Sequence, residues 1–185
     1  FVVIQTGTRV MEMRNVGSFD TPIRVAEEIP AEIQVPKMIE ICKQYGIFLK
    51  QHNTDYLSDD SLQWHPRLGI HSANVAPEFG VAETKALITV LEKNQLQAIA
   101  DQFLQLAFDS GKWKKWMLPD TDATDRDKSI IAGHYVFSTK ACQSLLEKAG
   151  KELQKKNIVL DKFLKEMIKQ SILRYLLNFR LLKKE

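Results

Sequence analysis

Residues 46–91 read GIFLKQHNTDYLSDDSLQWHPRLGIHSANVAPEFGVAETKALITVL, and this stretch decides the fold class. Two short runs, Ile47 to Gln51 and Arg67 to His71, are typical of strands, and each ends in a cluster of polar residues. A helix-periodic run follows the second cluster. In α/β proteins, ligands bind at the carboxyl ends of parallel strands, where side chains and loop amides converge. The stretch therefore predicts an α/β fold with a site at these two strand ends.

Length and composition indicate a globular protein. The chain has 185 residues, of which 44% are hydrophobic and 26% charged, as expected for one soluble domain. A net charge of +3, from 26 basic and 23 acidic residues, is too small to indicate a nucleic-acid partner. No uncharged apolar run approaches the roughly 20 residues of a membrane span. Cys42 and Cys142 stand far apart, which indicates neither a disulfide framework nor a thiolate metal site. We therefore expect a cytoplasmic protein with no membrane association.

The chain begins in a third predicted strand, Phe1 to Gln5. Its apolar run is typical of strands buried on both faces, which have neighbours on each side in parallel sheets. Gly7 permits a tight turn at the carboxyl end of this strand, and Arg9 follows in a charged loop. Because the sequence starts directly in such a strand, we expect it to begin inside a domain.

Helical periodicity, caps and breakers predict the remaining elements. Asp20 or Thr21 before Pro22 caps one helix; a second begins at Pro36 and ends at Gly46, and a short third begins at Ser58 and ends near Trp64. Residues 109–128, rich in tryptophan and charge, predict a long loop anchored by aromatic packing. The later helices are predicted at Phe79 to Lys93, Leu96 to Phe108, Asp125 to His134, Ser138 to Lys156, and over about twenty residues from Leu160 to Phe179.

Three of the four histidines lie within residues 46–91. His52 directly follows a predicted strand, beside Asn53, Thr54 and Asp55, which is where a metal ligand or a general acid/base is found in such folds. The alternative is a ring that bonds to a neighbouring loop. His71 ends the next predicted strand, but a shift of one position would turn it into the helix layer.

A phosphate site is the second candidate. The small or polar residues Ser72, Ala73 and Asn74, with Ala76, precede a predicted helix and can present backbone N–H groups to a phosphate, although small residues there also serve ordinary packing. The sequence contains no HExxH, G-x-S-x-G, P-loop or GxGxxG pattern. Serine hydrolase, nucleotide hydrolase and dinucleotide-dependent dehydrogenase activities are therefore disfavoured.

Three landmarks give the chain a family resemblance. The opening run from Val3 to Val10 is similar to a strand that ends in a glycine-threonine turn, and His52 to Tyr56 resembles a His-x-Thr-Asp-Tyr motif. The run from Ile70 to Leu87 is similar to a final barrel strand and its helix. Together they resemble the accessory, non-catalytic subunits of class II tagatose-bisphosphate aldolase, once also described as tagatose-6-phosphate kinases.

The resemblance implies an α/β fold that is the C-terminal part of a TIM (β/α)8 barrel, class II aldolase-like, with a helical C-terminal tail. Residues 1–110 would form the C-terminal half of the barrel, and residues 111–185 an aromatic and basic loop and a helical extension of the same domain. The strand Phe1 to Gln5 would then lie at an open sheet edge. By the same resemblance, His52 takes the place of the last zinc ligand of the catalytic aldolases, and residues 72–74 that of their phosphate loop.

The resemblance implies an accessory component of a tagatose-1,6-bisphosphate aldolase that supports a catalytic subunit. The alternative is an autonomous metal-dependent lyase or epimerase, or a homo-oligomer of it, acting on a phosphorylated or acidic sugar. In that case His52 and His71 would bind Zn²⁺, Asp55 would be the acid/base and Arg9 would grip an anionic group. Gly7, Asn53 and residues 72–74 (Ser72, Ala73, Asn74) would bind substrate or phosphate. A sugar-phosphate kinase is the third hypothesis.

Overall fold

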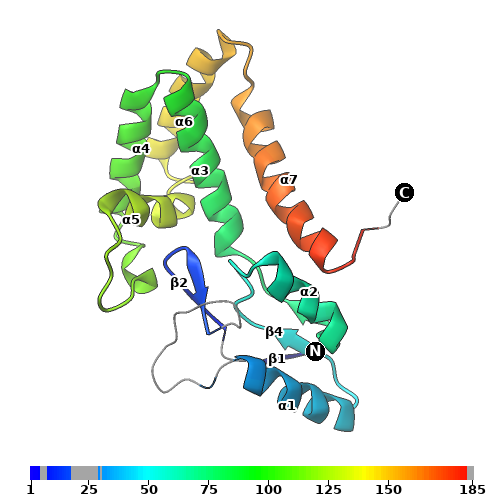
Figure 1. Cartoon of the computed structure of the whole chain (residues 1–185). Helices are drawn as coiled ribbons and strands as arrows, with labels where there is room; N and C mark the ends of the chain where they lie inside the picture. The colour runs from blue at the N-terminus through cyan, green and yellow to red at the C-terminus, as the bar shows by residue number, and fades with distance from the viewer. Residues whose placement is uncertain (5–7, 18–28, 30, 183–185) are drawn as a thin grey trace. The chain divides into compact units, whose positions relative to one another are not determined.

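A computed structural model of the chain describes residues 1–4, 8–17, 29 and 31–182. The chain divides into two compact units (Figure 1). Phe1–Ala76 and Leu173–Glu185 form the first, and Pro77–Ile172 forms the second. All the described strands lie in the first unit, whereas the second is helical. The predicted helix start at Asp20 or Thr21, and Gly7, fall outside the described residues.

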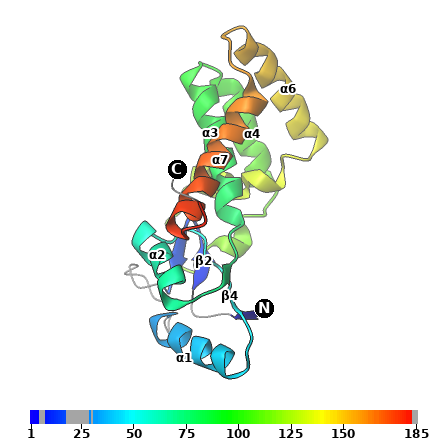
Figure 2. The same cartoon turned by 90° about the vertical axis from the view of Figure 1, so that its right-hand side faces the viewer.

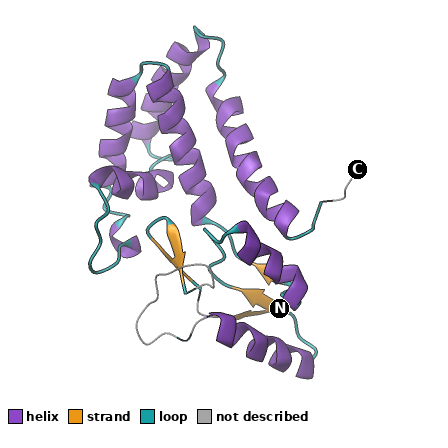
Figure 3. Cartoon of the chain, viewed as in Figure 1, coloured by secondary structure: helices purple, strands orange, loops and turns teal. Residues whose placement is uncertain are grey.

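The first unit contains a small parallel sheet. Its three strands, β1 (Val2–Ile4), β4 (Leu49–Gln51) and β5 (Ser72–Ala73), stand in the order β1-β4-β5. Figure 3 draws the strands in orange. Val2 pairs with Leu49, and Lys50 pairs with Ser72. The fold is therefore α/β, mostly helical, with an open parallel sheet in the part of the chain that the structure describes.

A β-hairpin replaces the charged loop predicted after the first strand. Strands β2 (Arg9–Met11) and β3 (Arg14–Val16) pair antiparallel around a turn in which Glu12 has a φ of 55°. The sequence of this turn carries no Asn-Gly, Asp-Gly or other glycine signal, which is why it reads as a loop. Val16 at its end is fully buried.

The first described helix, α1 (Ala31–Gln44), begins earlier than predicted, and Pro36 lies inside it. Its buried face starts before the proline, with residues at helical spacing that pack against Leu49 of β4: Ala31, Val35, Ile39 and Cys42. Burial of this apolar face stabilises the helix by more than the loss of one backbone hydrogen bond, which Pro36 cannot donate, destabilises it. The predicted end is confirmed, because Gly46 follows with a φ of 63° in the left-handed region.

The helix after Ser58 is longer than predicted, and the strand after it is displaced. Helix α2 (Asp59–Leu68) is capped at its start by the Ser58 side chain, which accepts a hydrogen bond from the Ser61 N–H. It ends at Gly69, which has a φ of 81°. Residues 67 and 68 are therefore helical, and the predicted strand from Arg67 to His71 is wrong: pairing with β4 begins only at Ser72.

The second unit is built from helices whose positions match the predicted periodicity. Helices α3 (Pro77–Lys93), α4 (Gln97–Asp109) and α5 (Asp125–Ala132) pack against one another, and α6 (Lys140–Gln154) packs against α4 (Figure 2). Helix α7 (Leu160–Asn178) runs from this unit into the first. Among the described residues, no helix combines the length and the apolar character required to cross a bilayer.

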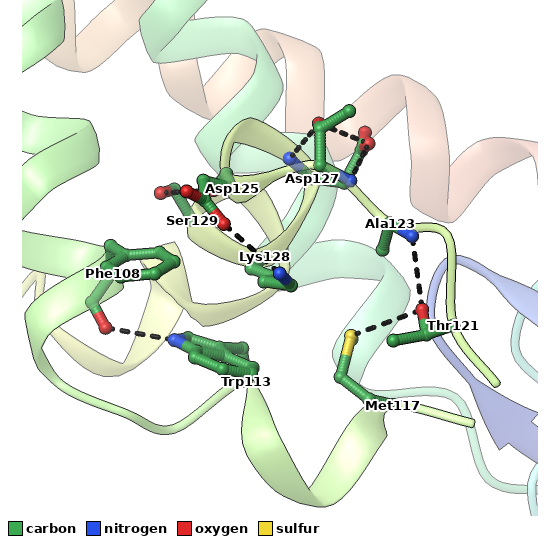
Figure 4. A network of polar contacts seen from close by, with 10 residues as sticks. Phe108, Trp113, Met117, Thr121, Ala123, Asp125, Asp127, Lys128 and Ser129 are labelled. Atoms are coloured by element: carbon green, nitrogen blue, oxygen red, sulfur yellow. Dashed lines mark hydrogen bonds and ion pairs between the residues drawn. The ribbon is translucent and has the colours of Figure 1, made fainter. Parts of the chain in front are cut away.

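Aromatic packing anchors the long segment between α4 and α5. The Trp113 ring stacks on Phe108 and donates its Nε1–H to the Phe108 carbonyl oxygen at 2.9 Å (Figure 4). Lys128 also contacts the Trp113 ring: its Nζ is 5.3 Å from the ring centroid and 3.1 Å from Asp125 Oδ1. A short 3₁₀ turn, η1 (Lys114–Trp116), follows. These contacts support packing of the loop by Trp113, as expected.

Gly133 is required by a close approach in the second unit. It opens a second 3₁₀ turn, η2 (Gly133–Tyr135), that packs against α3, and a Cβ at this position would lie 2.4 Å from Thr84 Cγ2. Gly133→Ala should therefore cost about 1–3 kcal/mol of unfolding free energy. Gly150→Ala, in α6 with open space around the added Cβ, is the matched control and should stabilise by up to about 1 kcal/mol. Chemical denaturation measures the unfolding free energy of both variants. An equal change in the two would contradict the close packing of Gly133 against Thr84.

His134 should make the second unit sensitive to acid. Burial, and then the Lys115 ammonium, lower the pKa of His134 below its ordinary 6.5. Below about pH 6.5, the unfolded chain then binds more protons at this histidine than the folded chain does. The contribution of neutral His134 to the free energy of unfolding is therefore fully present above about pH 6.5 and falls as the pH is lowered.

Replacing Lys115 tests whether its ammonium group contributes to the lowered pKa of His134. In Lys115→Met, the pKa of His134 should rise but stay below its ordinary value, because burial remains. NMR titration of the four imidazoles measures it, with Lys112→Met, in the same loop, as the control. A pKa of His134 that stays unchanged in Lys115→Met would contradict the assigned cause.

Candidate functional site

The polar segments after the parallel strands meet, as the sequence predicts. The backbone N–H of His52, after β4, donates to the carbonyl oxygen of Ile4 in β1 at 3.1 Å. On the other side, the N–H of Thr54 donates to the carbonyl oxygen of Asn74, after β5, at 2.9 Å. The residues from His52 to Tyr56 therefore lie at the carboxyl end of the sheet, bonded to the neighbouring strands on both sides.

Two residues of this segment have left-handed backbone conformations. Asn53 has a φ of 57° and Tyr56 a φ of 59°. Asparagine visits this region with little penalty, whereas a tyrosine there is uncommon. Asn53 and Tyr56 therefore bracket a sharply turned loop, whose central residues, Thr54 and Asp55, are buried.

Asn15 of the β2–β3 hairpin fixes this loop through side-chain hydrogen bonds to its backbone. Its Nδ2 donates to the carbonyl oxygens of Asn53 and Asp55, each at 2.8 Å. Its Oδ1 accepts from the Arg9 N–H at 3.3 Å, and the residue is only 3% exposed. One amide thus satisfies three backbone groups in a place with little access to water, which makes it a strong constraint on the loop.

Thr8 supplies a second bond of the same kind. The hydroxyl group donates to the His52 carbonyl oxygen at 2.7 Å, and the side chain is 1% exposed. Asn53 Nδ2 in turn donates to the Thr8 carbonyl oxygen at 3.4 Å. Thr8 and Asn15 were both missing from the sequence-based site, because the hairpin that brings them to the strand ends was not predicted.

Asp55, the predicted acid/base, lies inside the fold. It is 2% exposed, and its Oδ1 accepts a hydrogen bond from the Ala76 N–H at 2.9 Å. This bond joins the loop after β4 to the end of the segment that follows β5. The contacts show Asp55 as a structural link between the two loops; its acid/base role stays a prediction.

His52 differs from its neighbours in its exposure to solvent. The residue is exposed, while Gln51 before it and Thr54 after it are buried. Among the described residues, only its backbone takes part in the bonds that fix the loop, through the N–H to Ile4 and the carbonyl oxygen to Thr8. The imidazole is therefore placed at the carboxyl end of the sheet and is accessible from solvent, as a ligand-binding histidine requires.

His71 does not join His52. Since pairing with β4 begins at Ser72, His71 precedes β5 and lies level with Leu49, at the amino end of the sheet. Its Nδ1 accepts from the Leu49 N–H at 3.3 Å, and its ring lies 4.6 Å from that of Phe48. The sequence placed it at the carboxyl end because the predicted strand ended at His71, whereas β5 begins only at Ser72.

The predicted phosphate loop uses part of its backbone for folding. Ser72 and Ala73 form β5 itself, so only Asn74 of the three lies beyond the strand end. The Asn74 N–H donates to the Gln51 carbonyl oxygen at 3.0 Å, and the Ala76 N–H is bonded to Asp55. These two N–H groups already have partners in this structure, so phosphate binding here stays a prediction.

The other predicted ligands contribute no further cluster. Arg9 is half-buried in β2 and paired with Val16 in the hairpin, and Gly7 lies outside the described residues. Where the structure describes the chain, no group of three or more His, Cys, Asp and Glu side chains is arranged to hold a metal ion. A zinc ion bound through His52 would need ligands from elsewhere, and zinc binding stays a prediction.

Comparison with known proteins gives one distant structural similarity. No protein-family model and no curated protein sequence matches the chain. The fold is similar to the crystal structure of a probable tagatose 6-phosphate kinase from Sinorhizobium meliloti, with a TM-score of 0.63 and 14% sequence identity. The match covers 95% of this chain and 51% of the other, so the chain spans about half the length of that protein. At this identity, the similarity shows a shared fold.

Removing the Asn15 side chain should destabilise the first unit. Asn15→Ala removes the partner of a buried carbonyl oxygen and of two half-buried backbone groups, and should cost roughly 2–4 kcal/mol of unfolding free energy. His52→Ala, at the same strand ends but exposed, is the control and should change stability by less than about 0.5 kcal/mol. Urea denaturation of both variants provides the measurement. An equal loss in both would mean that Asn15 does not organise the loop.

Proposed function

We propose that this chain is an accessory component of a class II aldolase of the tagatose-1,6-bisphosphate type, supporting a separate catalytic subunit. The observation that carries the accessory role is the position of Asp55, which is 2% exposed and bonded through Oδ1 to the Ala76 N–H. A general acid or base must come within hydrogen-bonding reach of its substrate. A buried carboxylate that links two loops suits a scaffold better than a catalytic centre.

We further propose that the sheet is the C-terminal part of a (β/α)8 barrel. The strands are parallel and follow one another in chain order, and helices α1 and α2 precede β4 and β5, as in a barrel. At the β1 edge, Phe1 is 75% and Val3 56% exposed, and apolar residues at a strand edge favour a further strand beside them. The part of the similar structure that matches this chain is about half of that protein, which supports a fold larger than the three described strands.

The second candidate is an autonomous metal-dependent lyase or epimerase acting on a phosphorylated or acidic sugar, as a monomer or with another copy of the chain. The observation that favours it is the exposed imidazole of His52 at the carboxyl end of the sheet. A sugar-phosphate kinase ranks third: the name of the similar structure favours it, but the sequence has no nucleotide-binding loop.

The deciding experiment measures metal content and tagatose-bisphosphate cleavage of the full-length protein. Each measurement is made with the protein alone and after mixing with a catalytic class II aldolase subunit, for the parent and for His52→Ala. An accessory subunit should cleave no substrate alone. It should raise the activity or heat resistance of the catalytic subunit, and the parent and His52→Ala should do so equally.

Stoichiometric metal together with cleavage by the protein alone, lost in His52→Ala, would overturn the accessory proposal and establish the second candidate.

Asn15→Ala tests whether the accessory effect depends on the folded structure of the first unit and not on the His52 side chain. If it does, Asn15→Ala should raise the activity or heat resistance of the catalytic subunit less than the parent does, at temperatures where His52→Ala still acts as the parent does.

A further inference from the structure

An apolar groove of about 500 Å³ lies in the second unit. Its walls come from α3, from α6 and from the first turn of α7. The apolar residues that line it are Phe137, Leu146, Ile158, Val159, Leu160 and Leu164. The volume is within the roughly 300–1,000 Å³ of ligand-binding clefts. The second unit therefore presents a groove with room for apolar side chains of another molecule.

Carboxylates give this groove an acidic character. Glu83 of α3 is half-buried and Glu147 of α6 is exposed, and both line the groove. Neither has an ion-pair or hydrogen-bond partner among the described residues, whereas Asp161, which also lines the groove, is bonded to Lys165 at 2.8 Å. Burial raises the pKa of Glu83, and a nearby cation would favour its ionised form. The groove therefore fits a partner that brings both apolar side chains and a positive charge.

Gly150 lines the groove at a place where the chain itself does not require glycine. It lies inside α6, its backbone is not left-handed, and a Cβ added to it would meet no atom within 4 Å. Glycine in a helix is less stable than alanine, because it loses more conformational freedom on folding. Gly133, by contrast, is needed because a Cβ there would clash with Thr84. A glycine with neither reason allows another molecule to approach α6 closely.

The end of α7 carries a surface that complements the groove. Leu177 is 63% exposed and Leu181 is 66% exposed. Arg180, between them in the sequence, is exposed as well. We call these three residues the C-terminal ridge. It combines the apolar side chains and the positive charge that the groove lacks.

Arg180 stands at a position of the ridge that favours glycine. Its N–H donates to the Leu177 carbonyl oxygen at 3.0 Å, and the Leu181 N–H donates to that of Leu176 at 2.9 Å. In this type of helix-ending turn, the residue in Arg180's place is left-handed and is usually glycine. Arg180 has a φ of 57°, which destabilises the single chain because its side chain is bulky. Backbone strain of this kind is typical of residues that serve an interaction.

We propose that the C-terminal ridge of one copy of this chain docks in the groove of a second copy. The two leucines contact the apolar walls, and Arg180 lies beside Glu83 and Glu147. Apolar anchors around one desolvated arginine are typical of the residues that dominate interfaces. The proposal does not rest on the function proposed above.

The ridge of a chain cannot enter the groove of the same chain, because one helix carries both. Asp161 lines the groove in the first turn of α7, and Leu177 lies sixteen positions later, roughly 24 Å along the helix axis. The contact is therefore between copies. Reciprocal docking gives a closed dimer, and one-way docking gives longer assemblies.

Sedimentation velocity of the full-length protein over a range of concentrations tests the proposal. The protein should associate as its concentration rises, into dimers or longer assemblies. A monomer at every concentration would overturn the proposal.

Two variants separate docking from folding. Arg180→Gly relieves the left-handed strain, and Gly150→Leu places a side chain in open space, so both should be at least as heat-stable as the parent. Each should weaken association at least about fivefold, because Arg180→Gly removes the cation and Gly150→Leu fills the groove. Lys148→Leu is the control: it adds the same side chain to another face of α6 and should associate as the parent does. Association that persists unchanged in both test variants would place the contact on another surface and overturn the proposal.

A charge exchange tests which residues meet. Glu147→Arg and Arg180→Glu should each weaken association, because each brings like charges together across the contact. The double variant restores opposite charges and should associate more tightly than either single variant. A double variant that is no better than the weaker single variant would overturn the docking of Arg180 beside Glu147.

Discussion

The amide of Asn15 is the constraint on which the first unit depends. It reaches from the β2–β3 hairpin to two carbonyl oxygens of the loop after β4 and also accepts the Arg9 N–H. The Asp55 carbonyl oxygen is buried and the other two groups are half-buried, so the loss of the Asn15 amide would leave at least one of them without a partner in the interior. Without this amide, the loop that turns sharply at Asn53 and Tyr56 would lose its main tie to the hairpin.

The other bonds of the strand ends extend this constraint across the sheet. Thr8 fixes the His52 carbonyl oxygen, and Asp55 fixes the Ala76 N–H at the end of the segment that follows β5. The polar residues between His52 and Tyr56 therefore divide into two groups. Thr54 and Asp55 face the interior and hold the loops, whereas His52 faces solvent at the place where parallel-strand folds bind ligands.

This division bears on function, because a motif rich in ligand-type residues is used here chiefly for folding. The buried carboxylate explains why an accessory role is the better proposal, and the exposed imidazole explains why a metal-dependent activity remains the second. Two histidines of this unit also lie at opposite ends of the sheet: His52 follows β4, whereas His71 precedes β5 and lies level with Leu49.

Local sequence was sufficient for most helices. Periodic apolar residues predicted the positions of α3, α4, α6 and α7 to within a few residues, and the Ser58 cap and Gly46 marked a start and an end. These signals depend on neighbours three or four positions apart, which the chain itself contains. The strands β1 and β4 were likewise visible as apolar runs followed by polar residues.

What the sequence by itself determined was thus the α/β class, most helix positions and the meeting of polar segments at the strand ends. Only the tertiary structure decided that residues 67 and 68 are helical, that His71 lies at the far end of the sheet and that Asn15 belongs to the site. The physical reason is that strand register and buried hydrogen bonds join residues distant in the chain. Asn15 lies 38 residues from Asn53, and no local pattern encodes that pairing.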